Sequence, residues 1–234
     1  MPKTRKSDCL KDLKARILAQ DIAPGSDLDE QTLCEAYGIS RTPLREVLHR
    51  LAGDGYLRLQ ENRGAAVASM DIAVMRTFFQ TAPLVYSSIA RLAAENRTTA
   101  QLDRLKDTQG AFAKAARAGE AAQAALLNHR FHEEIGQMAQ NPYLFAALGR
   151  MLIDHTRLSQ TFFRPASDAD TARVAKSVAQ HDAMIAAFEA HATGTAVELT
   201  LAHWELSRDQ LERYVRPDPL PLDLVSEKDR AHAL

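Results

Sequence analysis

The spacing of apolar residues divides the chain into two parts with different secondary structure. Up to about residue 69, short helical patterns lead into a segment that alternates like a pair of strands, whereas residues 71–214 have helical spacing throughout. This predicts a mainly α protein, with a small N-terminal unit over 1–69 and an antiparallel all-α bundle of six helices over 70–215. Pro217, Pro219 and Pro221 predict an extended C-terminal tail over 216–234.

Three helices are predicted in the N-terminal unit. The first ends before the turn at residues 23–25 and buries Leu10, Leu13, Ile17 and Leu18. The second covers residues 29–37, and a tight link through Gly38 leads to the third. The third starts near Arg41, with Ser40 as an N-cap whose hydroxyl accepts a backbone hydrogen bond and with Pro43 in the first turn. Its buried face consists of Leu44, Val47, Leu48 and Leu51.

A β-hairpin is predicted after the third helix. Gly53 and Gly55 break the helix, and residues 56–59 and 65–68 follow as two strands joined by the turn at 61–64. Three helices followed by a hairpin within about seventy residues are typical of a winged helix-turn-helix, with the hairpin as the wing.

The six helices of the predicted bundle have similar lengths and short links. They cover residues 71–96, 99–118, 120–138, 142–163, 168–191 and 193–214. The links contain helix-ending signals such as Asn141-Pro142, Arg164-Pro165 and Thr193-Gly194.

Basic residues of the N-terminal unit are candidate DNA contacts. Arg41 and Arg45 lie on an exposed strip beside the apolar face of the third helix, so both can reach one groove together. Arg63, at the tip of the wing, would lie beside a phosphate or in a minor groove, and Gly64 lets the backbone come close. Residues 1–16 hold six Lys or Arg and two Asp, a basic excess that either meets the phosphate backbone or belongs to a solvated terminus.

Composition adds little to this picture. The 234 residues are 46% hydrophobic and carry a net charge of only −1, so the whole chain has no basic signature. Cys9 and Cys34 are too few for a disulfide framework and indicate free thiols. No run approaches eighteen apolar residues, and the N-terminus lacks a signal-peptide core. We therefore expect a cytoplasmic protein without a membrane partner.

The bundle contains a candidate metal site. Asn128 and His132 lie four residues apart on one predicted helix, and His181 and His203 lie on two others, so three helices can point four ligands inward. Imidazole suits zinc, nickel, copper or iron, and an amide oxygen is a weaker, neutral ligand. Spacing alone leaves open that each histidine is a core or surface residue.

The N-terminal unit resembles the winged helix-turn-helix of GntR-type transcription regulators. The resemblance rests on residues 13–67, with Ala23-Pro24-Gly25, the run from Ser40 to Glu46, Asp54-Gly55-Tyr56-Leu57 and Asn62-Arg63-Gly64. It implies that Arg41 and Arg45 read bases or nearby phosphates and that Ser40 and Thr42 hold phosphate. It also implies a wing contact through Asn62, Arg63 and Gly64. Gln31 stands where a DNA-gripping arginine is expected, so we expect only a hydrogen bond there.

The bundle resembles the FCD ligand domain of the FadR branch of that family, in its VanR-like six-helix form. The markers are Asn128 to His132, Asn141-Pro142, His181 and Ala202-His203-Trp204. The resemblance implies a divalent metal, most often zinc, with nickel or manganese as alternatives, held by an aspartate and three histidines beside a small organic acid. His132, His181 and His203 match the histidines. Asn128 replaces the aspartate, which removes a negative charge.

A second departure concerns the effector. The first bundle helix of the branch offers an arginine and a glutamate, and we align these positions with Thr81 and Val85. Because an arginine fork is the natural clamp for a carboxylate, its loss predicts an effector anchored by the metal, by Thr81 and Thr200, and by Arg157. Arg157 is equally compatible with the surface.

Together these features predict a ligand-responsive transcription regulator, with a repressor as the expected form, that binds an inverted-repeat DNA operator as a homodimer. A metal-dependent hydrolase using Glu133 as base is an alternative, but Gly136 stands where a zincin motif needs its second histidine. The other alternative is a helical metabolite-binding protein that does not bind DNA.

Overall fold

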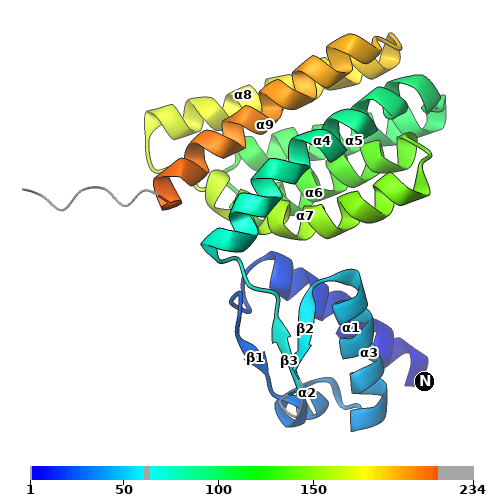
Figure 1. Cartoon of the computed structure of the whole chain (residues 1–234), viewed down its shortest axis with the longest axis vertical. Coiled ribbons are helices and arrows are strands. Elements are labelled where there is room, and N and C mark those ends of the chain that lie inside the picture. Colours follow the sequence, from blue (N-terminus) through cyan, green and yellow to red (C-terminus); the bar gives the residue numbers. More distant parts are fainter. Residues whose placement is uncertain (1, 61–63, 216–234) are drawn as a thin grey trace, which may run out of the picture.

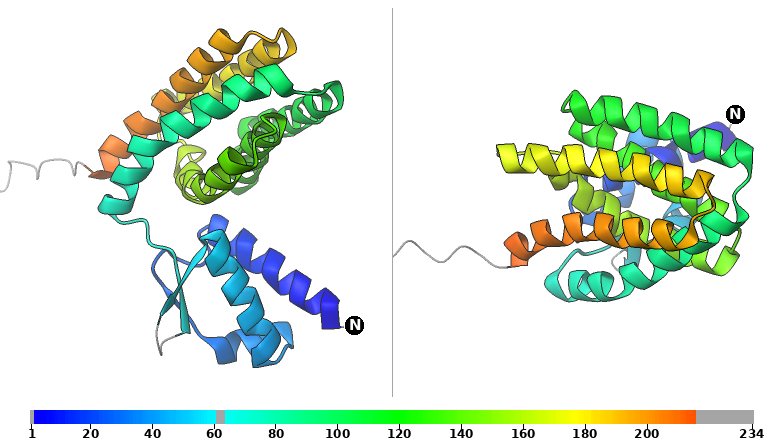
Figure 2. Two further views of the ribbon diagram at one scale, coloured as in Figure 1. Left: turned by 45° about the vertical axis from the view of Figure 1, so that its right-hand side comes forward. Right: turned by 90° about the horizontal axis from the view of Figure 1, so that it is seen from above.

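The computed structural model describes residues 2–60 and 64–215, and consists of a small N-terminal unit beneath a larger helical bundle (Figure 1). The predicted wing residues Asn62 and Arg63 and the predicted tail, 216–234, lie outside the described residues. The two further views show the bundle helices running alongside one another, with the N-terminal unit against one side of them (Figure 2).

The N-terminal unit is a winged helix-turn-helix. Its elements in chain order are α1 Pro2–Leu18, β1 Asp27–Leu28, α2 Glu30–Tyr37, α3 Arg41–Asp54, β2 Leu57–Gln60 and β3 Gly64–Val67. The sheet is antiparallel, with β3 between β1 and β2. Leu57 pairs with Val67, and Asp27 pairs with Ala66. The hairpin prediction is confirmed, and β1 is an additional strand that the sequence analysis did not predict.

Local hydrogen bonds define the helix-turn-helix corner. The side chain of Asp29 accepts from the backbone N–H of Thr32 at 2.6 Å and caps α2. Gly38 ends α2 with a φ of 58°, a left-handed conformation that suits glycine. Ser40 occupies the N-cap position of α3 as predicted, but its side chain makes no capping hydrogen bond, so that part of the prediction is wrong.

The bundle contains the six predicted helices. They are α4 Ile72–Asn96, α5 Thr99–Arg117, α6 Ala121–Met138, α7 Pro142–Phe162, α8 Asp168–Glu189 and α9 Thr193–Val215. Caps explain most boundaries: Thr98 and Gln101 form a reciprocal capping box on α5, and Asn141 caps α7 directly before Pro142. The predicted boundaries agree within two residues.

All six helices of the bundle contribute buried residues to its main core. Helix α4 packs against α6, α7, α8 and α9, and α5 closes the bundle against α6 and α8. Within the described residues, no helix is long and apolar enough to cross a membrane.

Helix α7 joins the bundle to the winged helix. Ile153, fully buried, belongs to the same apolar cluster as Leu13 and Leu51 of the N-terminal unit. Gln160 Nε2 donates to the carbonyl of Leu18 at 3.1 Å, and Arg150 Nη1 donates to the carbonyl of Gly55 at 2.6 Å. Apolar and polar contacts therefore hold the two parts together along one face of α7.

Two helix glycines provide a test of the bundle packing. A Cβ at Gly110 of α5 would meet no atom within 4 Å, whereas one at Gly136 of α6 would clash with Leu148 Cδ2 and lie 3.0 Å from Phe145 Cδ2. We expect Gly110→Ala to raise the free energy of unfolding by about 0.5–1 kcal/mol through helix propensity. Gly136→Ala should lower it by about 1–3 kcal/mol through overpacking. Urea denaturation of both variants checks this, and equal effects would contradict the described α6–α7 packing.

Candidate functional site

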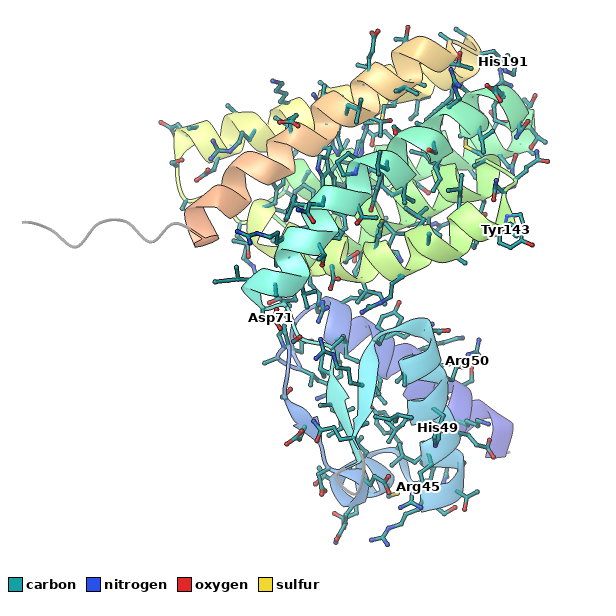
Figure 3. All side chains as sticks on the ribbon, viewed as in Figure 1. Arg45, His49, Arg50, Asp71, Tyr143 and His191 are labelled. Atoms are coloured by element: carbon teal, nitrogen blue, oxygen red, sulfur yellow. The ribbon has the colours of Figure 1, made fainter. Side chains whose placement is uncertain are left out.

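The outer side of the helix-turn-helix carries the predicted DNA contacts. Gln31, Ser40, Arg41, Thr42 and Arg45 are all exposed, while Leu44, Val47, Leu48 and Leu51 are buried as predicted. Pro43, in the first turn of α3, is half-buried. Figure 3 places Arg45 on α3 at the end away from the bundle, with His49 and Arg50 further along the helix. The structure thus brings the α2 and α3 candidates to one surface.

Arg45 is held in place by an acidic neighbour. Its Nε lies 3.1 Å from both carboxylate oxygens of Glu30, at the start of α2. Beside this pair, a groove of about 550 Å³ opens between α3 and the sheet, lined by His49, Gln60 and Gly64 among others. Arg45 and Glu30 also line this groove, so the arginine surface of α3 borders it.

Three basic residues of α1 contact other elements of the winged helix. Lys6 pairs with Glu46, and Lys14 Nζ lies 2.7 Å from Asp54 Oδ2. Arg5 Nη1 donates to the carbonyl of Gly38 at 3.2 Å. The N-terminal segment is therefore a helix packed on the unit, and two of its basic residues, Lys6 and Lys14, are paired with acidic residues of α3.

Three histidines meet inside the bundle. His132 of α6, His181 of α8 and His203 of α9 are all buried, and one ring nitrogen of each lies within 4.8 Å of those of the others. Phe131 stacks on the His181 ring with 3.8 Å between ring centroids. We call these three residues the histidine cluster.

The amide side chains around the cluster set the histidine tautomers. Gln109 Nε2 donates to the Val178 carbonyl and to Asp182 Oδ1, so its Oε1 is the atom that faces His181 Nδ1, at 3.0 Å. His203 Nδ1 lies 3.1 Å from Gln180 Oε1. Both Nδ1 atoms therefore carry the proton, and both Nε2 atoms present a lone pair.

This arrangement fits a metal ion. The Nε2 atoms of His181 and His203 are 3.2 Å apart, and two lone pairs at that distance repel unless a cation lies between them. His132 Nε2 and Asn128 Oδ1 are buried and have no hydrogen-bond partner among the described residues. Imidazoles whose second nitrogen is fixed by an outer hydrogen bond are the usual ligands of divalent transition metals.

A fourth histidine lies beside the cluster. The ring of His155, on α7, is 4.8 Å from that of His132 between centroids. Its Nδ1 is 2.7 Å from the Tyr86 hydroxyl of α4, and its Nε2 is 3.4 Å from Asn128 Nδ2. Neither His155 nor Tyr86 was predicted from the sequence. Helical spacing could have identified them as inward-facing residues. His155 continues the buried positions Leu148 and Leu152 of α7, and Tyr86 lies four residues after the buried Ala82 of α4.

Burial keeps these imidazoles uncharged. Desolvation lowers the pKa of His155 to about 3 and that of His203 to about 4. Desolvation, reinforced by the neighbouring histidines, lowers the pKa values of His132 and His181 well below the ordinary value. Neutral imidazoles are the form that binds metals.

The predicted effector residues are dispersed. Thr81 is exposed, and its hydroxyl donates to the Thr77 carbonyl. Val85 is half-buried, so the inward face of α4 carries Ala82 and Tyr86 instead, one residue beyond each assumed position. The buried Thr200 hydroxyl donates to the Ala196 carbonyl at 2.8 Å.

Arg157 is fully buried, which rules out the surface alternative. Its Nη1 donates to the Ala68 carbonyl at 2.7 Å, and its Nη2 pairs with Asp154. The guanidinium therefore faces the winged helix.

A winged helix joined to a helical bundle with a buried histidine cluster is the architecture of a two-domain DNA-binding regulator. Residues 7–67 match the family model of the bacterial regulatory proteins of the GntR family, and residues 84–206 match the FCD domain. The chain belongs to the GntR family and carries an FCD domain. The family consists of transcription regulators and not of enzymes.

The chain is similar to several known proteins. It is 26% identical to the galactonate operon transcriptional repressor of Escherichia coli (strain K12), over 80% of this chain and 87% of that protein. It is 28% identical to the Nta operon transcriptional regulator of Aminobacter aminovorans, over 52% of this chain and only 57% of that protein. The fold is similar to that of E. coli McbR/YncC, with a TM-score of 0.77 and 18% identity over 91% of this chain and 99% of that one.

The neutral histidines predict a pH-dependent stability. As the pH falls below about 6.5, the unfolded chain binds protons that the folded, metal-free cluster does not bind until about pH 4 or below. The free energy of unfolding should therefore fall with decreasing pH, by about 1.4 kcal/mol per pH unit for each histidine that stays neutral. Urea denaturation of chelator-treated protein at several pH values measures this slope. His203→Phe should make this slope shallower. An unchanged slope would contradict the inference that His203 stays neutral in the folded protein.

Proposed function

We propose that the protein is a metabolite-responsive DNA-binding transcription regulator, and that it acts as a repressor. It binds an inverted-repeat operator as a homodimer and responds to a small organic acid held at a divalent metal in the bundle. The observation that carries this proposal is the pairing of an exposed arginine surface on a winged helix with a buried histidine cluster in the domain packed against it.

The surface of α3 supports DNA reading. Arg41 and Arg45 project from the start of a helix whose other face is buried, which suits entry into a major groove. Ser40, Thr42 and Gln31 flank them with uncharged donors suited to phosphate, and Gly64 begins the wing strand β3. A relative that is similar over most of the chain is named a repressor, which favours repression over activation.

The homodimer and the inverted-repeat operator are linked parts of this proposal. One winged helix covers a short half-site, and two identical heads related by a twofold axis meet the same bases only on an inverted repeat.

The metal would be held by His132, His181 and His203, with Asn128 Oδ1 as the fourth ligand. Zinc fits three imidazoles and an oxygen best, and nickel and manganese are the alternatives. When bound, the metal supplies positive charge for the carboxylate of an effector. Within the protein, Gln109 and Gln180 hold the rings of His181 and His203, and Phe131 restricts the His181 ring by stacking.

Helix α7 would connect the metal site to the DNA-binding head. His155 points toward Tyr86 and Asn128, while Ile153 and Arg157 contact the winged helix. An effector that moves α7 therefore acts on the Arg157 contact with Ala68 and alters the head orientation. It shifts the population only if it binds one arrangement more tightly than the other.

Arg45→Ala tests the DNA-reading surface. The wild-type protein is used to select a binding sequence from a random DNA pool, and we expect an inverted repeat. Loss of a bidentate base contact should weaken binding to that sequence by about 1–3 kcal/mol. Arg104→Ala, which removes the same charge from an exposed position on α5, is the control and should leave binding unchanged. Fluorescence anisotropy measures both, and full affinity in Arg45→Ala would reject the surface.

His203→Ala tests the metal site. Protein purified without added metal should contain about one divalent ion per chain by elemental analysis, because three fixed imidazoles bind such ions tightly. His203→Ala should lose that ion. His49→Ala, at an exposed histidine of α3, should retain it. A metal-free wild type that cannot be loaded with zinc, nickel or manganese would make the cluster purely structural.

A further inference from the structure

The amide of Asn128 is held in one orientation by two acceptors. Its Nδ2 lies 3.4 Å from His155 Nε2 and 3.4 Å from Ser159 Oγ. The Ser159 hydroxyl proton is already donated to the His155 carbonyl at 2.8 Å, so Oγ is left to accept. The NH₂ end of Asn128 therefore faces α7, and its oxygen faces elsewhere.

Tyr86 completes this arrangement from the opposite side of His155. Its hydroxyl lies 2.7 Å from His155 Nδ1 inside the bundle. With the Nδ1 proton donated to Tyr86, His155 Nε2 presents the lone pair that Asn128 Nδ2 requires. A chain of hydrogen bonds thus runs from α4 through α7 to α6.

This orientation of the Asn128 amide determines where its oxygen lies. Within the part of the chain that the structure describes, Asn128 Oδ1 is buried without a hydrogen-bond partner, as is His132 Nε2 four residues further along the same face of α6. A buried, unpaired acceptor is unfavourable unless a ligand satisfies it. An aspartate would offer an oxygen in either orientation, but an asparagine offers one only if its amide is correctly turned.

We propose that Tyr86, His155 and Ser159 are positioning residues that turn the Asn128 amide so that Oδ1 completes the metal site. The inference rests on the metal site of the proposed function. It also gives a physical reason for the anionic effector of that function. Three imidazoles and an amide bring no negative charge, so the bound divalent ion keeps its full charge. A further ligand of the ion would therefore be favoured if it is an anion, such as a carboxylate.

A double-mutant cycle tests the positioning role, with Co²⁺ and Zn²⁺ affinity as the readout. In the wild-type background, His155→Phe removes the acceptor for Asn128 Nδ2 and should weaken metal binding about 10–100-fold, as loss of an outer-sphere partner does. In the Asn128→Asp background the same change should cost less than about threefold, because a carboxylate needs no amide orientation. Tyr86→Phe and Ser159→Ala are milder changes that should follow the same pattern if His155→Phe does not fold.

His129→Phe is the matched control. His129 is also on α6, and its Nδ1 lies 2.7 Å from the hydroxyl of Thr156 on α7, so the change disturbs the same helix pair without touching Asn128. It should alter metal affinity less than about threefold. A loss as large as that of His155→Phe would overturn the inference, because any disturbance between α6 and α7 would then suffice.

The remaining outcomes separate the two proposals. If the wild type binds neither metal, the metal site and the positioning role both fail. If it binds metal but His155→Phe costs the same in both backgrounds, the metal site stands and the positioning role is rejected. The charge argument has its own readout: acetate should change the visible spectrum of the Co²⁺-loaded wild type at concentrations about tenfold lower than for Asn128→Asp. Equal acetate affinity in the wild type and Asn128→Asp would reject the inference that the charge of the site determines the class of effector.

Discussion

The buried guanidinium of Arg157 is the constraint that links the two parts of the molecule. A fully buried charge is tolerated only when it is paired and hydrogen-bonded, and its partners here are Asp154 of the same helix and the Ala68 carbonyl at the end of the winged helix. Withdrawal of the winged helix would break the hydrogen bond from Arg157 Nη1 to the Ala68 carbonyl. Ile153 packs in the apolar core of the winged helix, so its burial also depends on contact between the two parts. The two parts are therefore held in a defined arrangement along α7.

This arrangement gives α7 two roles on adjacent faces. His155 and Ser159 point toward Asn128, while Ile153, Arg157 and Gln160 contact the winged helix. An α-helix moves as a rigid element over such a short span, so a small rotation that improves one set of contacts strains the other. Coupling through α7 therefore needs no long pathway, because the residues of both sites alternate along two turns of one helix.

Much of the fold could be predicted from the sequence, because the signals are local. Asn141-Pro142 and Thr98 with Gln101 define helix starts by hydrogen bonding within a few residues, and the predicted ends agree closely with α4 to α9. Strand β1 escaped prediction because its two residues have no periodicity and depend on pairing with β3. Thr81 and Val85 were chosen from a resemblance in sequence, which does not specify the rotation of α4. The packing of the bundle does, and it buries Ala82 and Tyr86 on that helix.

The two functional surfaces differ in how far sequence determines them. Arg41 and Arg45 could be recognised from the sequence because exposed arginines next to an apolar stripe stay charged and accessible, whichever residues pack elsewhere in the protein. The histidine cluster is different, since its chemistry depends on neighbours distant in sequence: Gln109 and Gln180 set the tautomers, and burial lowers the pKa values. Packing four neutral imidazoles together leaves polar atoms unpaired and reduces stability as the pH falls. A bound cation would relieve both costs at once, so metal binding and folding of the bundle should be thermodynamically linked.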